Sequence, residues 1–173
     1  NWSGAQHVSS SRHGFLRKIS GGHGWNSGAV STQTISHSSL AQGVSFRCTS
    51  TTGPTDKTGH VMAGLSKASV ENAEQHYKDL AFGIQCHHNG NIGIYESGTH
   101  IGYHGSYSAS DVFMVQVTGN GVQYLKNGVS FYTSTHVPTF PLRVDSALYS
   151  EGAEISAVTM SSEDAKFGRS EER

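Results

Sequence analysis

Short β-prone segments separated by turns that contain glycine or asparagine recur along most of the 173-residue chain. No long stretch carries an apolar stripe at the spacing of a helix, and the best helical candidate, 69–75, is short. Segments of this length, rich in β-branched and aromatic residues, are typical of strands. We therefore expect an all-β domain with strands at 15–20, 43–49, 61–67, 77–86, 91–96, 112–118, 122–126, 129–134, 142–148 and 153–159.

Several of the turns specify antiparallel pairing. Asn127-Gly128 lies between two predicted strands, and both central residues of a two-residue type I′ hairpin need the positive φ that Asn-Gly tolerates. Asn89-Gly90 and Gly119–Gly121 separate two further pairs of strands. Many short strands with almost no helix favour a sandwich or a barrel. We expect one domain over 1–160 and a polar C-terminal tail, 161–173, outside the core.

The charge composition excludes two classes of partner. With 12 Lys and Arg against 13 Asp and Glu, the net charge is −1, so the chain has no basic field to hold nucleic acid or an anionic membrane. No apolar run approaches the length of a membrane span. Few charges with abundant Ser, Thr and Gly are more typical of an extracellular β-rich domain than of a cytosolic helical enzyme.

The two cysteines, Cys48 and Cys86, occupy apolar positions of two predicted strands. They can form one disulfide, which would add roughly 3–4 kcal/mol across a loop of this length. Two buried thiols would pack equally well as small hydrophobic groups. The sequence leaves both alternatives open.

The order of the strand segments resembles the concanavalin A-like jelly-roll domains, above all the compact lectins of the slime-mould hemagglutinin I type and related bacterial surface domains. The segments that carry the resemblance are 15–18, 24–29, 64–66, 77–80, 91–96, 124–128, 131–134, 141–145 and 148–150. One departure is Ser110-Asp111, where the relatives have a Gly-Asp pair.

The resemblance implies a two-sheet antiparallel jelly roll and non-catalytic carbohydrate binding. The chain would be a secreted lectin, agglutinin or cell-surface recognition module, with glycans or glycoproteins as partners. Self-association into a homo-oligomer would raise avidity. The core would contain Phe46, Leu65, Leu80, Phe82, Ile84, Ile92, Ile94, Phe113, Val115, Phe131, Leu142, Val144 and Ile155.

Patterns that mark an enzyme are missing from the sequence. Glycosidases of this fold place alternating carboxylates on one strand, but Asp79, Glu96 and Asp145 each stand alone on theirs. There is no Gly-x-Ser-x-Gly elbow and no Walker-type phosphate loop. We expect no enzymatic activity and no catalytic residue.

Eleven histidines are the strongest hint of a metal site, yet their spacing does not favour one on a single strand. His100 and His104 would stand about 13 Å apart on an extended strand. His87 and His88 are neighbours and would point to opposite faces. No loop rich in Asp and Asn resembles a calcium site. We expect no metal and no cofactor, while a histidine cluster formed across strands stays open.

A sugar site needs an aromatic ring to stack on a pyranose and polar groups to bind its hydroxyls. The segment 87–107 is richest in both, and alternation places Ile92 and Ile94 in the core, Tyr95 outward and Glu96 inward. Trp25 is a second stacking candidate, for which core packing is favoured. The candidate carbohydrate-binding residues are His87, His88, Asn89, Asn91, Tyr95, His100, Tyr103, His104 and Tyr107.

The alternative function is a structural or assembly protein of an extracellular matrix or biomineral. Serine hydroxyls and protonatable imidazoles can contact mineral or polysaccharide surfaces without a pocket. A lectin would show saturable inhibition by one sugar, whereas a matrix protein would assemble in a pH-dependent way as its histidines titrate.

Overall fold

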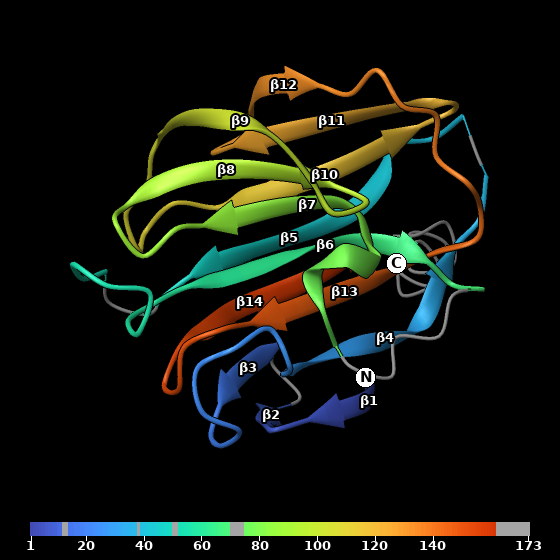
Figure 1. The fold of residues 1–173 in the computed structure, drawn as a ribbon. Coiled ribbons are helices and arrows are strands. Elements are labelled where there is room, and N and C mark those ends of the chain that lie inside the picture. The colour runs from blue at the N-terminus through green and yellow to red at the C-terminus, as the bar shows by residue number, and fades with distance from the viewer. Residues whose placement is uncertain (12–13, 38, 50–51, 70–74, 162–173) are drawn as a thin grey trace, which may run out of the picture.

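A computed structural model describes residues 1–11, 14–37, 39–49, 52–69 and 75–161. These residues form two seven-stranded sheets that pack face to face, with every strand pair antiparallel (Figure 1). The predicted all-β, two-sheet jelly-roll architecture is confirmed.

The first sheet has the strand order β1-β4-β13-β6-β7-β8-β9. Its strands are β1 (Trp2–Gln6), β4 (Gly28–Ile35), β13 (Leu142–Leu148), β6 (Val61–Lys67), β7 (Leu80–Cys86), β8 (Asn91–Glu96) and β9 (Thr99–Ser106). A short 3₁₀ helix, η1 (Tyr77–Asp79), leads into β7.

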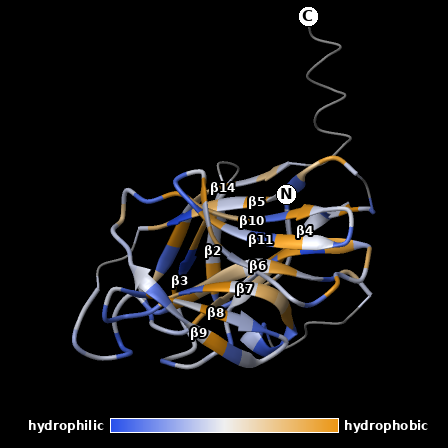
Figure 2. Cartoon of the chain, turned by 90° about the horizontal axis from the view of Figure 1, so that it is seen from above, coloured by the Kyte–Doolittle hydropathy of each residue, from blue (hydrophilic) through white to orange (hydrophobic). Residues whose placement is uncertain are grey.

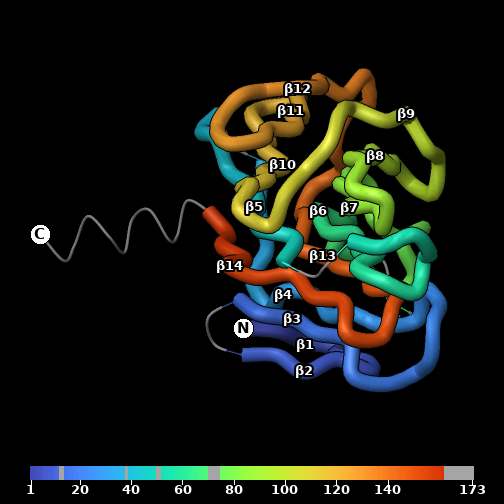
Figure 3. The backbone as a smooth tube through the Cα atoms, turned by 90° about the vertical axis from the view of Figure 1, so that its left-hand side faces the viewer, coloured from blue at the N-terminus to red at the C-terminus, as the bar shows by residue number. Residues whose placement is uncertain are grey.

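The second sheet has the order β12-β11-β10-β5-β14-β3-β2. Its strands are β12 (Val129–Thr133), β11 (Gly121–Lys126), β10 (Phe113–Thr118), β5 (Gln42–Cys48), β14 (Glu154–Ser161), β3 (Phe15–Lys18) and β2 (Val8–Ser11). Figure 3 shows the two sheets from the side, with β12 and β9 at one end of the sandwich and β1 and β2 at the other.

The main core lies between the sheets and consists of the inward-facing alternate residues of both. Hydrophobic residues concentrate on the strands, while the loops are largely hydrophilic (Figure 2). The expected core residues are buried, except that Phe131 is half-buried. Leu80 is buried on the outer face of the first sheet instead of the face toward the main core. It packs there with Met62 and Ala147 in a second, smaller cluster.

A β-bulge explains the position of Leu80. The register between β6 and β7 shifts where Leu65 pairs with Phe82 and Ser66 pairs with Leu80. The extra residue in β7 is Ala81, and a bulge of this kind reverses the alternation beyond it. Leu80 therefore leaves the face to which Phe82 belongs.

The strands differ from the sequence expectation in five main places. β1, β2, β4 and β9 were not expected as strands, and residues 77–79 form η1 instead of the beginning of a strand. The segment 69–75, a short helical candidate that could equally be a loop, lies mostly outside the described residues, as does the predicted tail beyond Ser161, the last residue of β14.

The Asn127-Gly128 turn is confirmed, with φ of 51° and 81°. Asn127 is also fixed to the turn at Asp111: its amide donates to Asp111 Oδ1 (2.9 Å), and its Oδ1 accepts from Val112 N (2.9 Å). Asp111 Oδ2 accepts from Ser108 N at 2.8 Å. Asp111 thus organises the turn at 108–111, and these hydrogen bonds hold the pKa of its carboxyl below the usual value.

Cys48 and Cys86 form a disulfide, which settles the alternative left open by the sequence. Cys48 ends β5 of the second sheet and Cys86 ends β7 of the first, so the bridge ties the two sheets together. Residues 87–90 follow directly as the turn into β8.

Lys18 is a buried cation, only 1% exposed, at the end of β3. Its ammonium group donates to the carbonyl oxygens of Gly24 (2.8 Å) and Tyr149 (2.9 Å) and to Asn26 Oδ1 (2.7 Å). Burial lowers the pKa of Lys18 to about 8. The hydrogen bonds hold the loop 21–26 against residue 149.

No helix among the described residues is long and apolar enough to cross a membrane.

Candidate functional site

The outer face of the first sheet carries an aromatic surface instead of a polar one. Met62 of β6 and Leu80 of β7 face outward from this sheet. They are nevertheless buried, and they form a small apolar cluster there with Ala147. Trp25 and Tyr95 pack over this cluster together with Tyr77 of η1. The sheet is therefore covered by rings on the side away from the main core.

Seven rings on this face contact one another in a closed circuit, which we call the aromatic patch. The patch consists of Trp25, His60, Tyr77, His87, Tyr95, His100 and Tyr103. Its members come from β8, β9, η1 and the loops that precede β4, β6 and β8. Successive centroid distances around the circuit are 5.3 Å for Trp25–Tyr77, 5.2 Å for Tyr77–Tyr95, 4.9 Å for Tyr95–His100, 4.7 Å for His100–Tyr103, 5.8 Å for Tyr103–His87, 4.8 Å for His87–His60 and 4.9 Å for His60–Trp25.

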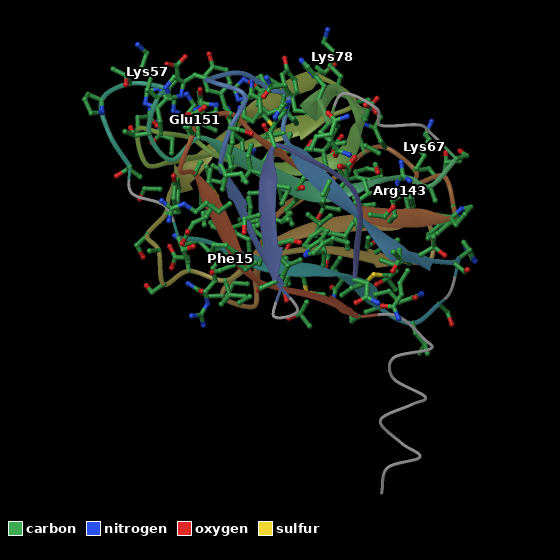
Figure 4. The ribbon with its side chains drawn as sticks, turned by 90° about the horizontal axis from the view of Figure 1, so that it is seen from below. Phe15, Lys57, Lys67, Lys78, Arg143 and Glu151 are labelled. Atoms are coloured by element: carbon green, nitrogen blue, oxygen red, sulfur yellow. A yellow bond between two sulfur atoms is a disulfide. The ribbon has the colours of Figure 1, made fainter. Side chains whose placement is uncertain are left out.

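The patch is accessible at its β9 side. Tyr103 is 52% exposed and its neighbour His100 is also exposed, whereas Tyr95 and Trp25 are half-buried. Lys57 and Lys78 are exposed at the periphery and project into solvent in Figure 4. Burial raises the pKa of Tyr95, so its hydroxyl stays protonated and able to donate.

The loop that carries Trp25 is held by Lys18, whose ammonium group binds the carbonyl of Gly24 and the side chain of Asn26 on either side of it. Tyr149, whose carbonyl accepts another of these hydrogen bonds, lies 5.3 Å from the Trp25 ring. The buried cation thus fixes one end of the aromatic patch.

His60 is the buried member of the patch, at 7% exposed. Its Nε2 lies 3.0 Å from the Gln85 amide nitrogen, and its Nδ1 accepts a long hydrogen bond from His88 N at 3.4 Å. Burial, reinforced by the two neighbouring histidines, lowers the pKa of His60 to about 4. His60 is therefore a neutral imidazole at neutral pH.

His87 and His88 lie side by side, contrary to the expectation that they point to opposite faces. β7 ends at Cys86, so both belong to a turn, where strand alternation does not apply, and their ring centroids are 4.2 Å apart. Nδ1 of His88 lies 3.1 Å from the Gly53 carbonyl oxygen. Burial lowers the pKa of His87.

One ring nitrogen from each of His60, His87 and His88 lies within 4.8 Å of the other two. Among the described residues, this is the one group of three His, Cys, Asp or Glu side chains close enough to hold a metal ion. Neutral imidazoles are good ligands for zinc and other late transition metals.

The structure brings together five of the nine predicted carbohydrate-binding residues. Four of them, His87, Tyr95, His100 and Tyr103, belong to the aromatic patch, and His88 stacks against its edge. The alternation argument for Tyr95 is correct.

The other four predicted site residues have different roles. The Tyr107 hydroxyl donates to the His87 carbonyl at 2.8 Å, and burial raises the pKa of Tyr107 to about 12. His104 packs against Phe131 and Tyr132, away from the patch. Asn89 and Asn91 form the turn, where Asn89 Oδ1 accepts from Asn91 N.

Sequence reasoning missed His60, Tyr77 and Gln85. His60 precedes β6 and meets His87 through the pairing of β6 with β7, 27 residues later in the chain. Tyr77 was assigned to a strand. Gln85 alternates with core residues on β7, and that parity was a usable signal that it faces the same side as Tyr95.

Glu96 is the one candidate carboxylate of β8, and it is occupied in structural contacts. It is 3% exposed and points between the sheets, where Oε1 accepts from the Tyr124 hydroxyl at 2.8 Å. Oε2 lies 2.5 Å from Nδ1 of His136. Glu96 therefore bonds to a tyrosine and a histidine, as expected from its inward parity.

A separate groove of about 750 Å³ lies at the opposite end of the sandwich. Trp2, Ser10, Thr32, Gln33 and Met160 are among its lining residues. It offers one indole ring with several hydroxyl and amide groups.

The sequence matches no protein-family model and no curated protein. Solved structures do resemble the fold. The SPRY domain of human HERC1 has a TM-score of 0.66 at 14% identity, covering 92% of this chain and 98% of that one. The Emp46p carbohydrate recognition domain has a TM-score of 0.61 at 11% identity, covering 88% and 84%.

An enzyme shares the architecture as well. The alginate lyase AlgAT5 has a TM-score of 0.54 at 13% identity, covering 85% of this chain and 68% of that one. The fold thus occurs in binding domains and in catalysts, and the ligand has to be argued from the site. Two antiparallel seven-stranded sheets and these structural neighbours together show that the chain has the concanavalin A-like jelly-roll fold.

Proposed function

We propose that the chain is a non-catalytic carbohydrate-binding domain, a lectin or recognition module, whose sugar site is the aromatic patch. The observation that carries the proposal is the half-exposed Tyr103 ring, which lies beside the imidazoles of His87 and His100. A pyranose presents C–H bonds on one face and hydroxyl groups around its edge. Tyr103 offers a stacking surface for that face, and the flanking ring nitrogens offer hydrogen bonds for the hydroxyls.

The surrounding rings support a fixed site. Tyr95 and Tyr77 pack over Met62 and Leu80, and the Trp25 loop is held by Lys18. Rings held in this way lose little further conformational freedom when a sugar binds. The patch is shallow at Tyr103, so the affinity of one site would be modest and self-association would supply avidity.

The absence of catalysis is also part of the proposal. Cleavage of a glycosidic bond by the usual mechanism needs two carboxylates a few ångströms apart on either side of the bond. Glu96, the candidate on β8, is buried between the sheets and bonded to Tyr124 and His136. The interior position of this carboxylate supports binding without hydrolysis.

An extracellular location with glycoprotein partners completes the proposal. The Cys48–Cys86 disulfide persists in oxidising compartments. Glycans of cell surfaces and secreted proteins occur in the same compartments.

The test is a glycan array at neutral pH with the wild-type chain, Tyr103→Ala and Gln33→Ala, each with and without EDTA. Gln33 lines the separate groove and is exposed, so its variant is a matched control. Selective binding to one glycan class that is lost in Tyr103→Ala and kept in Gln33→Ala supports the proposal.

Three results would contradict it. Loss of binding in Gln33→Ala alone would move the sugar to the groove. Cleavage of the bound glycan would make the chain an enzyme. No selective binding, together with pH-dependent assembly, would favour the structural or matrix role.

A further inference from the structure

We propose that His60, His87 and His88 form a site for one divalent late-transition metal ion of the Zn²⁺ class. The three side chains belong to the two segments that flank the β6–β7 pair at one end of the first sheet. The inference concerns metal binding by itself and does not depend on whether the aromatic patch takes a sugar.

The geometry is close to that of a bound site. The three ligand nitrogens lie within 4.8 Å of one another. With Zn–N bonds of 2.0–2.1 Å, two nitrogens of a tetrahedral site are about 3.3 Å apart. Each pair thus has at most about 1.5 Å to close. His87 and His88 are half-buried in a turn, where side-chain rotation can supply this movement.

The orientation of His88 is the second observation. Its Nδ1 lies 3.1 Å from the Gly53 carbonyl, which can only accept a hydrogen bond, so Nδ1 carries the proton. The lone pair is then on Nε2. A ligating histidine that donates its other N–H to a backbone carbonyl is the usual arrangement around protein-bound zinc.

Gln85 supplies the corresponding partner for His60. The Gln85 amide faces His60 Nε2 at 3.0 Å, while its Oε1 is buried and has no hydrogen-bond partner within the described residues. Turning the amide by half a rotation would let His60 Nε2–H donate to this oxygen. The turn satisfies the buried oxygen. The His60 Nδ1 lone pair, which accepts the long hydrogen bond from His88 N, would bind the metal ion in place of that N–H.

The chemical class of the ion follows from the ligands. Three imidazole ligands suit Zn²⁺, Cu²⁺, Ni²⁺ or Co²⁺ and disfavour Ca²⁺ and Mg²⁺, which take oxygen ligands. The burial of His60 beside Trp25 keeps its imidazole in place. Three protein ligands leave the fourth position of a tetrahedral ion open to water or to an oxygen of a ligand.

The experiment is isothermal titration of the untagged full chain with Zn²⁺ alone, after removal of bound metal with EDTA and dialysis. The expected result is one ion per chain. His88→Ala should weaken binding at least tenfold, and so should His87→Ala, with thermal unfolding confirming that each variant is folded.

His100→Ala is the matched control, because His100 belongs to the same patch but not to the trio. It should bind Zn²⁺ like the wild type. The Co²⁺-loaded chain should show the visible absorption of a tetrahedral ion, and this absorption should change in His88→Ala.

The Gln85→Ala variant tests the orientation argument. Loss of the partner of a ligating histidine is expected to weaken binding about 10- to 100-fold without changing the stoichiometry. The proposal is overturned if the chain binds no Zn²⁺, or if His100→Ala weakens binding as much as His88→Ala does.

Discussion

Cys48 of β5 and Cys86 of β7 join the two sheets by a disulfide whose second cysteine directly precedes His87. The bridge therefore holds together the sandwich and also anchors the turn that carries two of the clustered histidines. These two roles can be separated by measuring stability and ligand binding on the same variant.

Replacing both cysteines by alanine should lower the free energy of unfolding by about 4 kcal/mol, because the bridge closes a loop between residues 38 positions apart in the unfolded chain. Urea unfolding of the double variant and of the wild type measures the difference. A loss below about 1 kcal/mol would show that the bridge does little to stabilise the sandwich.

The lowered pKa of Lys18 predicts that the free energy of unfolding rises with pH above pH 8. Its pKa is about 8 in the folded chain against 10.5 for an ordinary lysine. Below pH 8 both states hold the proton, but between these two values the unfolded state binds it more, so the contribution of Lys18 to stability increases with pH. The free energy of unfolding, measured from pH 8 upward, should rise relative to that of Lys18→Met.

The Lys18→Met variant should also be less stable at neutral pH, by about 3 kcal/mol, because carbonyl oxygens of residues 24 and 149 would lose their donor. A parallel pH dependence in the variant and in the wild type would contradict the assignment of the pH effect to this ammonium group.

The parts of the fold and of the candidate site that the sequence could predict are those with local patterns. Alternation along 91–96 correctly placed Tyr95 outward and Glu96 inward, and Asn127-Gly128 marked its hairpin. These features depend on local geometry alone, and local patterns are visible in one sequence.

The misses have longer-range causes. Leu80 lies on the face opposite to the expected one because of a β-bulge, which depends on the register of β7 with β6. His60 meets His87 only after β6 and β7 pair, and a glycine-rich segment concealed the strand β9. Strand alternation also failed for His88, because β7 ends two residues before it. Register and strand ends are set by tertiary contacts that no single segment encodes.

Gly64 is expected to tolerate no side chain. A Cβ at this position would lie 1.9 Å from the carbonyl oxygen of Phe82, a backbone atom of the neighbouring strand that cannot move aside. Gly64→Ala should cost about 1–3 kcal/mol of stability. At Gly121 the nearest atom to such a Cβ is 3.5 Å away, so Gly121→Ala is the matched control and should be nearly neutral in thermal unfolding.

Tyr124→Phe removes the hydrogen bond to the buried carboxylate of Glu96 and should lower stability by about 1.5–3 kcal/mol. Burial, followed by the charge of Glu96, raises the pKa of Tyr124 above that of an exposed tyrosine. The folded chain thus keeps this proton at pH values where the unfolded chain loses it, and stability falls as pH rises above about 10.

Above about pH 10, the Tyr124→Phe variant should lose less stability than the wild type, as measured by urea unfolding at successive pH values. If both chains lose stability equally above that pH, Tyr124 is not the residue responsible.

In the proposed function, the sugar stacks on the Tyr103 ring of the aromatic patch. The most direct measurement is the dissociation constant of the best glycan from the array for the wild type, Tyr103→Phe and Tyr103→Ala. Near-normal affinity is expected for Tyr103→Phe, which keeps the stacking ring, and a loss of about tenfold or more for Tyr103→Ala, corresponding to about 1.4 kcal/mol. Equal affinity of Tyr103→Ala and the wild type would show that the sugar does not stack on Tyr103.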